Sequence, residues 1–188
     1  MRVLIACEFS GIVRDAFKSR GHDAWSCDII PSIRDGNHIQ DNVLNNVLNN
    51  NWDLMIAHPP CTHLCSSGAR WFAVKSDLQQ DALLFVNQLL NCDIPKICIE
   101  NPIGIISTKI RKPDQIIQPW MFGHPESKAT CLWLKNIPKL KPTNVLEKKL
   151  KYWENQTPSG QNKLSSSRSQ LRSITYHGIA AAMADQWG

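Results

Sequence analysis

The segment from His58 to Arg70 combines residue types that can do chemistry. Two consecutive prolines, Pro59 and Pro60, restrict the backbone just before Cys61 and predict that its thiol is held in one orientation. A cysteine attacks as its thiolate, which a nearby cation favours, and Arg70 can supply that cation if the fold brings it close. The segment therefore predicts a nucleophilic cysteine.

The apolar run that begins at Ile94 ends in Glu100, which Asn101 and Pro102 follow. A carboxylate at the rim of a buried strand loses hydration, so we expect a raised pKa for Glu100 and a proton held near neutral pH. Such a group can act as a general acid. A structural glutamate at the start of a loop is the alternative that the residues alone leave open.

A zinc site is a competing interpretation of the cysteine segment, because His58, Cys61, His63 and Cys65 are all of types that bind zinc. Structural zinc sites usually draw their ligand pairs from two separate turns, and the two prolines stiffen this segment. We therefore expect no metal here.

Two earlier loops contain residues suited to a nucleoside cofactor. Phe9, Ser10 and Gly11 form a tight turn into a predicted helix, whose free N-terminal amides suit a carboxylate or a phosphate. Asp28 ends a predicted strand, where an acidic side chain in a Rossmann-like sheet commonly binds ribose hydroxyls. A helix cap or a surface charge explains Asp28 equally well when it is taken alone.

The elements that must position these residues alternate between short apolar runs and helical periodicity, which is typical of βα units. We predict an α/β fold with a Rossmann-like, doubly wound and mostly parallel sheet. Ligands of such sheets lie outside the carboxyl ends of the strands. The expected strands are Arg2–Ala6, Asp23–Cys27, His38–Gln40, Asp53–Ala57, Ile94–Glu100 and Thr130–Leu134, and the expected helices are Gly11–Arg20, Leu78–Asn91 and Tyr176–Trp187.

The length of 188 residues predicts one domain, with a basic loop segment rich in Ser and Asn at about 141–173. Nine of the 21 Lys and Arg residues lie between 135 and 175, with only two of the 16 acidic residues. This charge suits a phosphate backbone, although a solvated face explains it nearly as well. No apolar stretch approaches a bilayer span, and we expect reduced, mostly buried cysteines and a cytoplasmic location.

Taken in order, these loops resemble the motifs of the DNA cytosine-5 methyltransferase family along most of the chain. Phe9-Ser10-Gly11 is similar to the family's cofactor loop, Pro60-Cys61 with Cys65 and Gly68 to its nucleophile motif, and Glu100-Asn101-Pro102 to its Glu-Asn-Val motif. The resemblance implies methyl transfer from S-adenosylmethionine to carbon 5 of cytosine. That carbon is too poor a nucleophile until a thiolate adds to carbon 6, which gives Cys61 its role, and Glu100 would serve N3.

The resemblance also assigns the remaining site residues. It implies cofactor contacts for Phe9, Ser10, Gly11, Asp28, Asp41, Pro60 and Gly178, substrate contacts for Arg70, Asn101, Lys148, Arg168 and Arg172, and a catalytic role for Lys128 beside Cys61 and Glu100. The expected partner is DNA or a cytosine nucleotide, without membrane contact, in the cytoplasm of a bacterium that hosts a phage or prophage.

Two departures from the family pattern concern the substrate. Lys128 and Thr130 stand where the family has two arginines, so only one cation remains. The long target-recognition domain between this motif and Gly178 is missing, as in short members from phages and prophages. The basic stretch from Lys148 to Arg172 is then the candidate for binding a DNA backbone. The recognised DNA sequence should be short, or there should be no sequence selectivity. The resemblance suggests protection of phage DNA from restriction as the biological role.

Two rival functions remain open at this point. His58-Pro59-Pro60-Cys61 also resembles the Asp/Asn-Pro-Pro-aromatic motif of enzymes that methylate exocyclic amino groups, although histidine and cysteine fill its end positions poorly. A catalytically silent nucleic-acid-binding protein would keep the fold and the basic segment, and would tolerate loss of Cys61.

Overall fold

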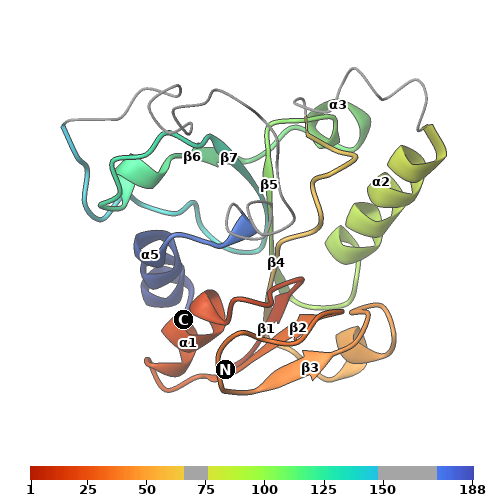
Figure 1. Cartoon of the computed structure of the whole chain (residues 1–188), viewed down its shortest axis with the longest axis horizontal. Coiled ribbons are helices and arrows are strands. Elements are labelled where there is room, and N and C mark those ends of the chain that lie inside the picture. Colours follow the sequence, from red (N-terminus) through yellow and green to blue (C-terminus); the bar gives the residue numbers. More distant parts are fainter. Residues whose placement is uncertain (66–75, 148–172) are drawn as a thin grey trace.

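The computed structural model describes residues 1–65, 76–147 and 173–188 (Figure 1). Its seven-stranded sheet has the order β3-β2-β1-β4-β5-β7-β6. The strands are β1 (Arg2–Ala6), β2 (Asp23–Asp28), β3 (His38–Gln40), β4 (Leu54–Ala57), β5 (Lys96–Pro102), β6 (Gln115–Ile117) and β7 (Thr130–Lys135). The described helices are α1 (Ile12–Lys18), α2 (Ser76–Leu90), α3 (Ile106–Lys109) and α5 (His177–Trp187), with 3-10 turns η1 (Val47–Asn49) and η3 (Pro119–Met121). The predicted α/β class with a mostly parallel, Rossmann-like sheet is confirmed.

The direction of the strands decides which loops meet. β1 pairs in parallel with β2 and β4, and the parallel pairing continues to β3 on one side and to β5 on the other. β7 runs antiparallel between β5 and β6. Thr130 at the start of β7 pairs with Pro102 at the end of β5. The amino end of β7 therefore lies at the same edge as the carboxyl ends of the parallel strands, where ligands of such sheets bind.

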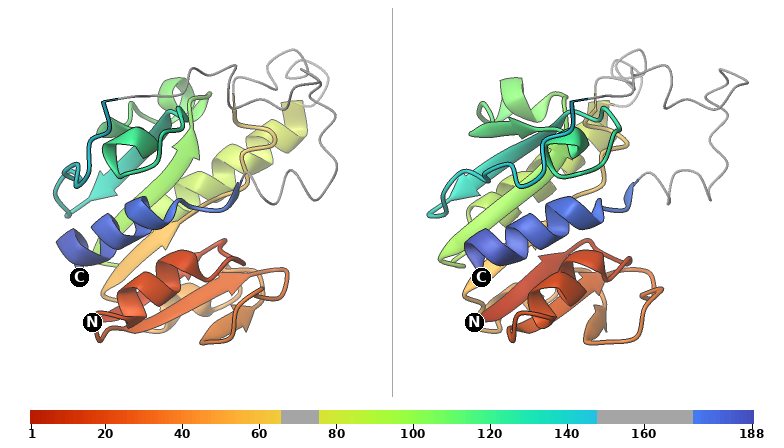
Figure 2. Two further views of the ribbon diagram at one scale, coloured as in Figure 1. Left: turned by 60° about the vertical axis from the view of Figure 1, so that its left-hand side comes forward. Right: turned by 90° about the vertical axis from the view of Figure 1, so that its left-hand side faces the viewer.

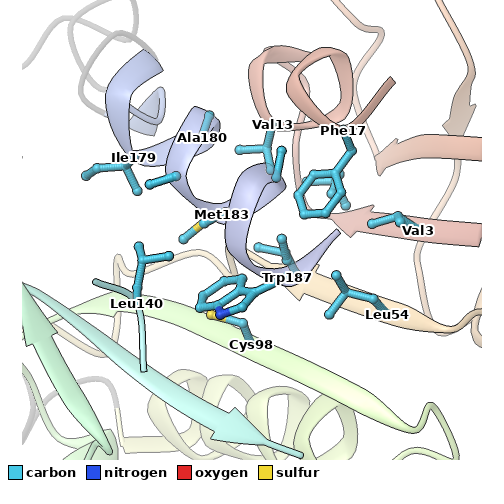
Figure 3. Packing of buried hydrophobic residues seen from close by; sticks show 14 of the residues in the cluster. Val3, Val13, Phe17, Leu54, Cys98, Leu140, Ile179, Ala180, Met183 and Trp187 are labelled. Atoms are coloured by element: carbon cyan, nitrogen blue, oxygen red, sulfur yellow. The ribbon is translucent and has the colours of Figure 1, made fainter. Parts of the chain in front are cut away.

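One face of the sheet is covered by α1 and α5, which pack side by side (Figures 1 and 2). Ile179, Met183 and Trp187 follow one another at four-residue spacing and form one apolar stripe along α5. Figure 3 shows this stripe between Phe17 of α1 and the sheet. Each such buried side chain contributes about 1.5–3 kcal/mol to the stability of the fold.

The opposite face packs against α2 through Val86 and Leu89. Alternate residues of β1 serve the two faces, since Val3 belongs to the cluster under α1 and Leu4 to the cluster under α2. Burial on both faces explains the continuous apolar runs that predicted the parallel strands. Within the described part of the chain, no helix combines the length and the apolar character that crossing a bilayer would need.

The structure departs from the expected elements in the second half of the chain. β6 and α3, of three and four residues, were not predicted, because they lie where repeated prolines make the apolar pattern irregular. β7 was expected to end the sheet, yet β6 lies outside it. The cysteines are free as expected, but Cys7, Cys61, Cys65 and Cys92 are only partly buried, so the expectation of mostly buried thiols is wrong.

Candidate active site

The loop between β1 and α1 is closed by the carboxylate of Glu8. Its Oε1 accepts hydrogen bonds from Val13 N at 2.7 Å and from Ser10 Oγ at 3.0 Å, and its Oε2 accepts one from Arg14 N at 3.3 Å. Gly11 precedes the helix with a φ of 70°, a conformation that glycine adopts without strain. The expectation of free helix amides for a cofactor carboxylate or phosphate is wrong, because the chain's own carboxylate takes them.

Behind this loop, the fully buried Arg14 forms a polar network that sequence reasoning missed. Its guanidinium donates hydrogen bonds of 2.8–3.4 Å to the carboxylate of Asp15, the hydroxyls of Ser26 and Ser32, and the carbonyls of Arg34 and Asp35. The network ties the segment that follows Asp28 to α1. It therefore shapes the edge of the sheet at which a nucleoside is expected.

Asp28 and Asp41 come at the ends of the neighbouring strands β2 and β3. Asp28 is half buried, which raises its pKa, and its Oδ1 accepts a hydrogen bond from Ile30 N at 3.2 Å. Asp41 is exposed, and its Oδ1 accepts hydrogen bonds from Asn42 N at 2.7 Å and from Asn45 Nδ2 at 3.0 Å. Each aspartate forms hydrogen bonds within its own turn. Both turns lie at the edge of the sheet where the predicted cofactor contacts would have to be.

The segment after β4 folds into one helical turn that begins at Cys61. The Cys61 carbonyl accepts hydrogen bonds from Leu64 N and Cys65 N, both at 3.0 Å. This turn brings the thiols of Cys61 and Cys65 within hydrogen-bonding reach. The contact with Cys65 is the largest cause of a raised pKa at Cys61, followed by burial and by the negative charges of Cys65 and Glu100, whereas the charge of Lys128 lowers that pKa.

Substitution of Cys65 by alanine should make Cys61 more reactive. Removing the largest cause of the raised pKa lowers that pKa and increases the thiolate fraction at neutral pH. The gain in alkylation rate is about threefold for each unit of pKa, because a less basic thiolate is also a weaker nucleophile. Iodoacetamide labelling of the Cys61 peptide, followed by mass spectrometry, measures this rate.

Cys92→Ala is the matched control, because this partly buried thiol lies at the far end of β5 and donates to the Leu89 carbonyl. It should leave the labelling rate of Cys61 unchanged. An unchanged rate in Cys65→Ala itself would mean that burial, and not the neighbouring thiol, controls Cys61.

Glu100 meets His58 where β4 and β5 end. Nδ1 of His58 lies 3.1 Å from Oε2 of Glu100, and the two side chains are 8% and 19% exposed. Burial is the largest single influence and raises the Glu100 pKa, but the hydrogen bond and charge of His58, the charge of Lys128 and the Thr130 hydroxyl together lower it below its ordinary value. The expectation of a raised Glu100 pKa is therefore wrong. Sequence reasoning counted the burial and missed the histidine 42 residues earlier.

Lys128 lies in the segment that enters β7, and its charge acts on both Cys61 and Glu100. Its Nζ is 6.0 Å from the centre of the Tyr176 ring. One pocket is lined by Glu100, Lys128, Thr130, Ser173, Thr175, Tyr176 and Ile179. The pocket joins two of the predicted catalytic residues to the start of α5, whose residues were not predicted to lie beside them.

Asn101 and Gly178 each have a structural contact at this edge. Nδ2 of Asn101 donates to the Pro59 carbonyl at 2.7 Å, which ties the end of β5 to the loop of Cys61. The amide of Gly178 donates to His124 Nε2 at 3.0 Å, and a Cβ at this glycine would collide with the Phe122 carbonyl. Close packing alone therefore requires glycine at position 178.

The predicted residues divide into three groups. Cys61, Glu100 and Lys128 come together, with Asn101 buried beside them and Pro60 exposed just before the nucleophile. Phe9, Ser10, Gly11, Asp28 and Asp41 line the loops that follow β1, β2 and β3. Gly68, Arg70, Lys148, Arg168 and Arg172 lie outside the described residues.

Three residues of this edge carried signals that sequence reasoning did not use for these roles. His58 was considered as a zinc ligand and as the first position of an amino-methylation motif, but not as a partner of Glu100. Glu8 and Arg14 flank the cofactor loop, and a charged residue inside an apolar helix face is a sign of a buried network. Among the described residues, no group of three or more His, Cys, Asp or Glu side chains is arranged to hold a metal ion.

Comparison with protein-family models gives no match, and comparison with the sequences of curated proteins gives none either. Solved structures do match. A predicted DNA modification methyltransferase encoded within an E. coli prophage superposes with a TM-score of 0.53 at 14% sequence identity, over 84% of this chain and 55% of its own. The methyltransferase EhMeth of Entamoeba histolytica gives a TM-score of 0.54 at 16% identity, over 80% of this chain and 57% of its own.

The chain thus spans little more than half of the length of either match. At these identities the likeness concerns the fold. The chain has a Rossmann-like fold similar to that of these two methyltransferases.

Proposed function

We propose that this protein transfers a methyl group from S-adenosylmethionine to carbon 5 of cytosine, most favourably in DNA, through a covalent adduct with Cys61. The observation that carries the proposal is the convergence of Cys61, Glu100 and Lys128 from the ends of β4 and β5 and the start of β7. A nucleophile, a carboxyl group and a cation at the ligand-binding edge of a methyltransferase fold suit this reaction.

Each residue has a task that the chemistry of cytosine requires. The thiolate of Cys61 forms a bond to carbon 6, which moves electron density to carbon 5 and makes that carbon nucleophilic. The carboxyl group of Glu100 serves N3, which gains a proton as the ring is attacked. Lys128 favours the thiolate, because its positive charge lowers the Cys61 pKa. Loss of the proton at carbon 5 then expels the cysteine.

The residues at the edge formed by β1, β2 and β3 fit the nucleoside of S-adenosylmethionine. The half-buried carboxylate of Asp28 can accept hydrogen bonds from ribose hydroxyls. Ile29, which follows it, is 72% exposed and offers an apolar surface to a flat base. The cofactor supplies an electrophilic methyl group on a sulfonium. We assign Phe9, Ser10, Gly11, Asp41, Pro60 and Gly178 to the same site as predicted contacts.

DNA is the substrate that the basic segment favours. Lys148, Arg168 and Arg172 would contact the phosphate backbone, Arg70 and Asn101 would lie near the target base, and selectivity for the surrounding sequence would be short or absent. A cytosine inside a duplex must be flipped into the pocket at a cost of a few kcal/mol, which is smaller for a single strand. Single-stranded DNA and free deoxycytidine nucleotides are therefore included in the test. Protection of phage DNA and a cytoplasmic location remain predictions.

The test is incubation with isotope-labelled S-adenosylmethionine and duplex DNA, single-stranded DNA or deoxycytidine nucleotides, followed by mass spectrometry of the nucleosides. We expect labelled 5-methylcytosine, and the substrate that yields it identifies the substrate class. Label on an exocyclic nitrogen would replace the proposal by amino-group methylation. If no substrate is labelled but the protein binds DNA, the alternative of a catalytically silent nucleic-acid-binding protein replaces the proposal.

A further inference from the structure

The side chain of His58 contacts Glu100. Its ring is nearly buried, and Nδ1 lies 3.1 Å from Oε2 of Glu100. Nε2 is buried and has no hydrogen-bond partner within the described part of the chain. A buried ring nitrogen without a partner costs free energy, so the placement of this histidine calls for an explanation other than stability. The hydrogen-bonded route by which the ring can pass a proton leads to Glu100.

The charge state of Glu100 shows what the ring can supply. A carboxylate whose pKa lies below its ordinary value carries no proton at neutral pH, so by itself it has none to give to a base. The His58 ring, when it is protonated, can supply one across its 3.1 Å contact with Oε2 of Glu100. Glu100 is more exposed than His58 and lines the pocket with Lys128 and Thr130, so it is the member of the pair that can face a substrate.

We propose that His58 is a positioning residue that holds Glu100 and supplies the proton which Glu100 delivers to N3 of the cytosine. The inference rests on the function proposed above. The N–H bond at Nδ1 of His58 breaks, and Oε2 of Glu100 takes the proton. Glu100 then releases a proton to the base, where an N–H bond forms at N3. Glu100 is again a carboxylate at the end of the transfer. The imidazole is left neutral. The proton returns by the same route after the cysteine has been expelled.

The transfer also acts on the nucleophile. While it is protonated, Glu100 no longer places a negative charge beside Cys61, and that charge is one of the causes of the raised Cys61 pKa. Protonation of Glu100 and formation of the thiolate are therefore favoured together. The charge of Lys128 acts on Glu100, and the charge of Glu100 also raises the pKa of Cys98 on β5 and of Cys131 on β7. Cys65 is the titratable neighbour of Cys61.

The decisive variant is His58→Asn, because the amide nitrogen of asparagine takes the place of Nδ1 and keeps a donor toward Glu100 without a titratable ring. In the wild type, kcat for cytosine methylation at saturating substrate should fall through a transition as pH rises, because the proposed route needs a protonated ring. In His58→Asn this dependence should disappear, and kcat below that transition should be about 10²-fold lower or more. His63→Asn, in the same loop, is the control and should keep the wild-type profile.

A second readout needs no activity. Carbon-13 NMR of the labelled glutamate carboxyl groups, with the Glu100 resonance assigned by Glu100→Gln, should show a higher Glu100 pKa in His58→Asn than in the wild type. The reason is that His58 is among the groups that lower it. Thermal melting establishes that each variant is folded.

The outcomes separate the two proposals. A wild type that methylates cytosine, with a His58→Asn variant of unchanged rate, unchanged pH profile and unchanged Glu100 titration, overturns the role of His58 and leaves the function standing. A His58→Asn variant that is slower but keeps the wild-type pH profile also overturns it, since its effect is then purely structural. A wild type that methylates no cytosine overturns both.

Discussion

Cys61→Ala should reduce methyl transfer to cytosine by about 10⁴-fold or more, because removal of the nucleophile from a covalent mechanism leaves only binding and orientation. The fold should survive, since Cys61 is only partly buried and the hydrogen bonds of its turn involve its backbone carbonyl. The rate of labelled 5-methylcytosine formation, measured under single-turnover conditions, gives the reduction directly.

The adduct itself can be captured with an oligonucleotide that contains 5-fluorocytosine. Fluorine at carbon 5 cannot leave as a proton, so the cysteine stays attached to carbon 6 once the methyl group has been transferred. We expect a mass increase on the peptide that contains Cys61 in the wild type and in Cys92→Ala, and none in Cys61→Ala. Methylation by Cys61→Ala within tenfold of the wild-type rate would remove Cys61 from the mechanism.

Arg14→Met should strongly destabilise the fold. The guanidinium is fully buried, and its loss removes one donor from two hydroxyls and two carbonyls of the neighbouring segments. Breaking such a buried network costs about 3 kcal/mol in the free energy of unfolding. For a chain of this size, that corresponds to a fall in Tm of about 6–12 °C.

Arg20→Met is the matched control, because Arg20 follows the same helix and forms a more exposed ion pair with Asp185 at 3.4 Å. Exposed pairs contribute about 1 kcal/mol or less, so its Tm should change by no more than a few degrees. Thermal denaturation followed by circular dichroism compares the two variants. If both substitutions lowered the Tm equally, the buried network of Arg14 would contribute no more to stability than the exposed ion pair of Arg20.

The parts of the fold that could be predicted are those that repeat a pattern. Burial on both faces makes β1, β4 and β5 continuous apolar runs, and the four-residue stripe of α5 is visible in the sequence. Their order implies that Cys61 and Glu100 end neighbouring parallel strands, so this pair could be found without coordinates. β6 could not be found, because a strand of three residues between prolines carries no periodicity.

The electrostatics of the site could not be predicted, because they depend on contacts between distant segments. The sequence shows that Glu100 ends a buried strand, which indicates a raised pKa, but it does not show that His58 and Lys128 face the same carboxylate. The same limit applies to Glu8. Its position beside the cofactor loop is visible in the sequence, whereas its capture of the amides of α1 depends on how the loop folds.

The packing of α5 against α1 has a consequence for the order of folding. Val13 and Phe17 of α1 bury their side chains in the cluster that Met183 and Trp187 complete, so this core joins segments more than 160 residues apart, as the Arg20–Asp185 separation of 165 shows. At about 5–20 residues per second, a ribosome makes α5 roughly ten to thirty seconds after α1. During that interval the apolar side of α1 lacks the part of its cover that α5 supplies, and such long-range closure is intrinsically slow. The newly made chain should therefore depend on protection from aggregation until α5 emerges.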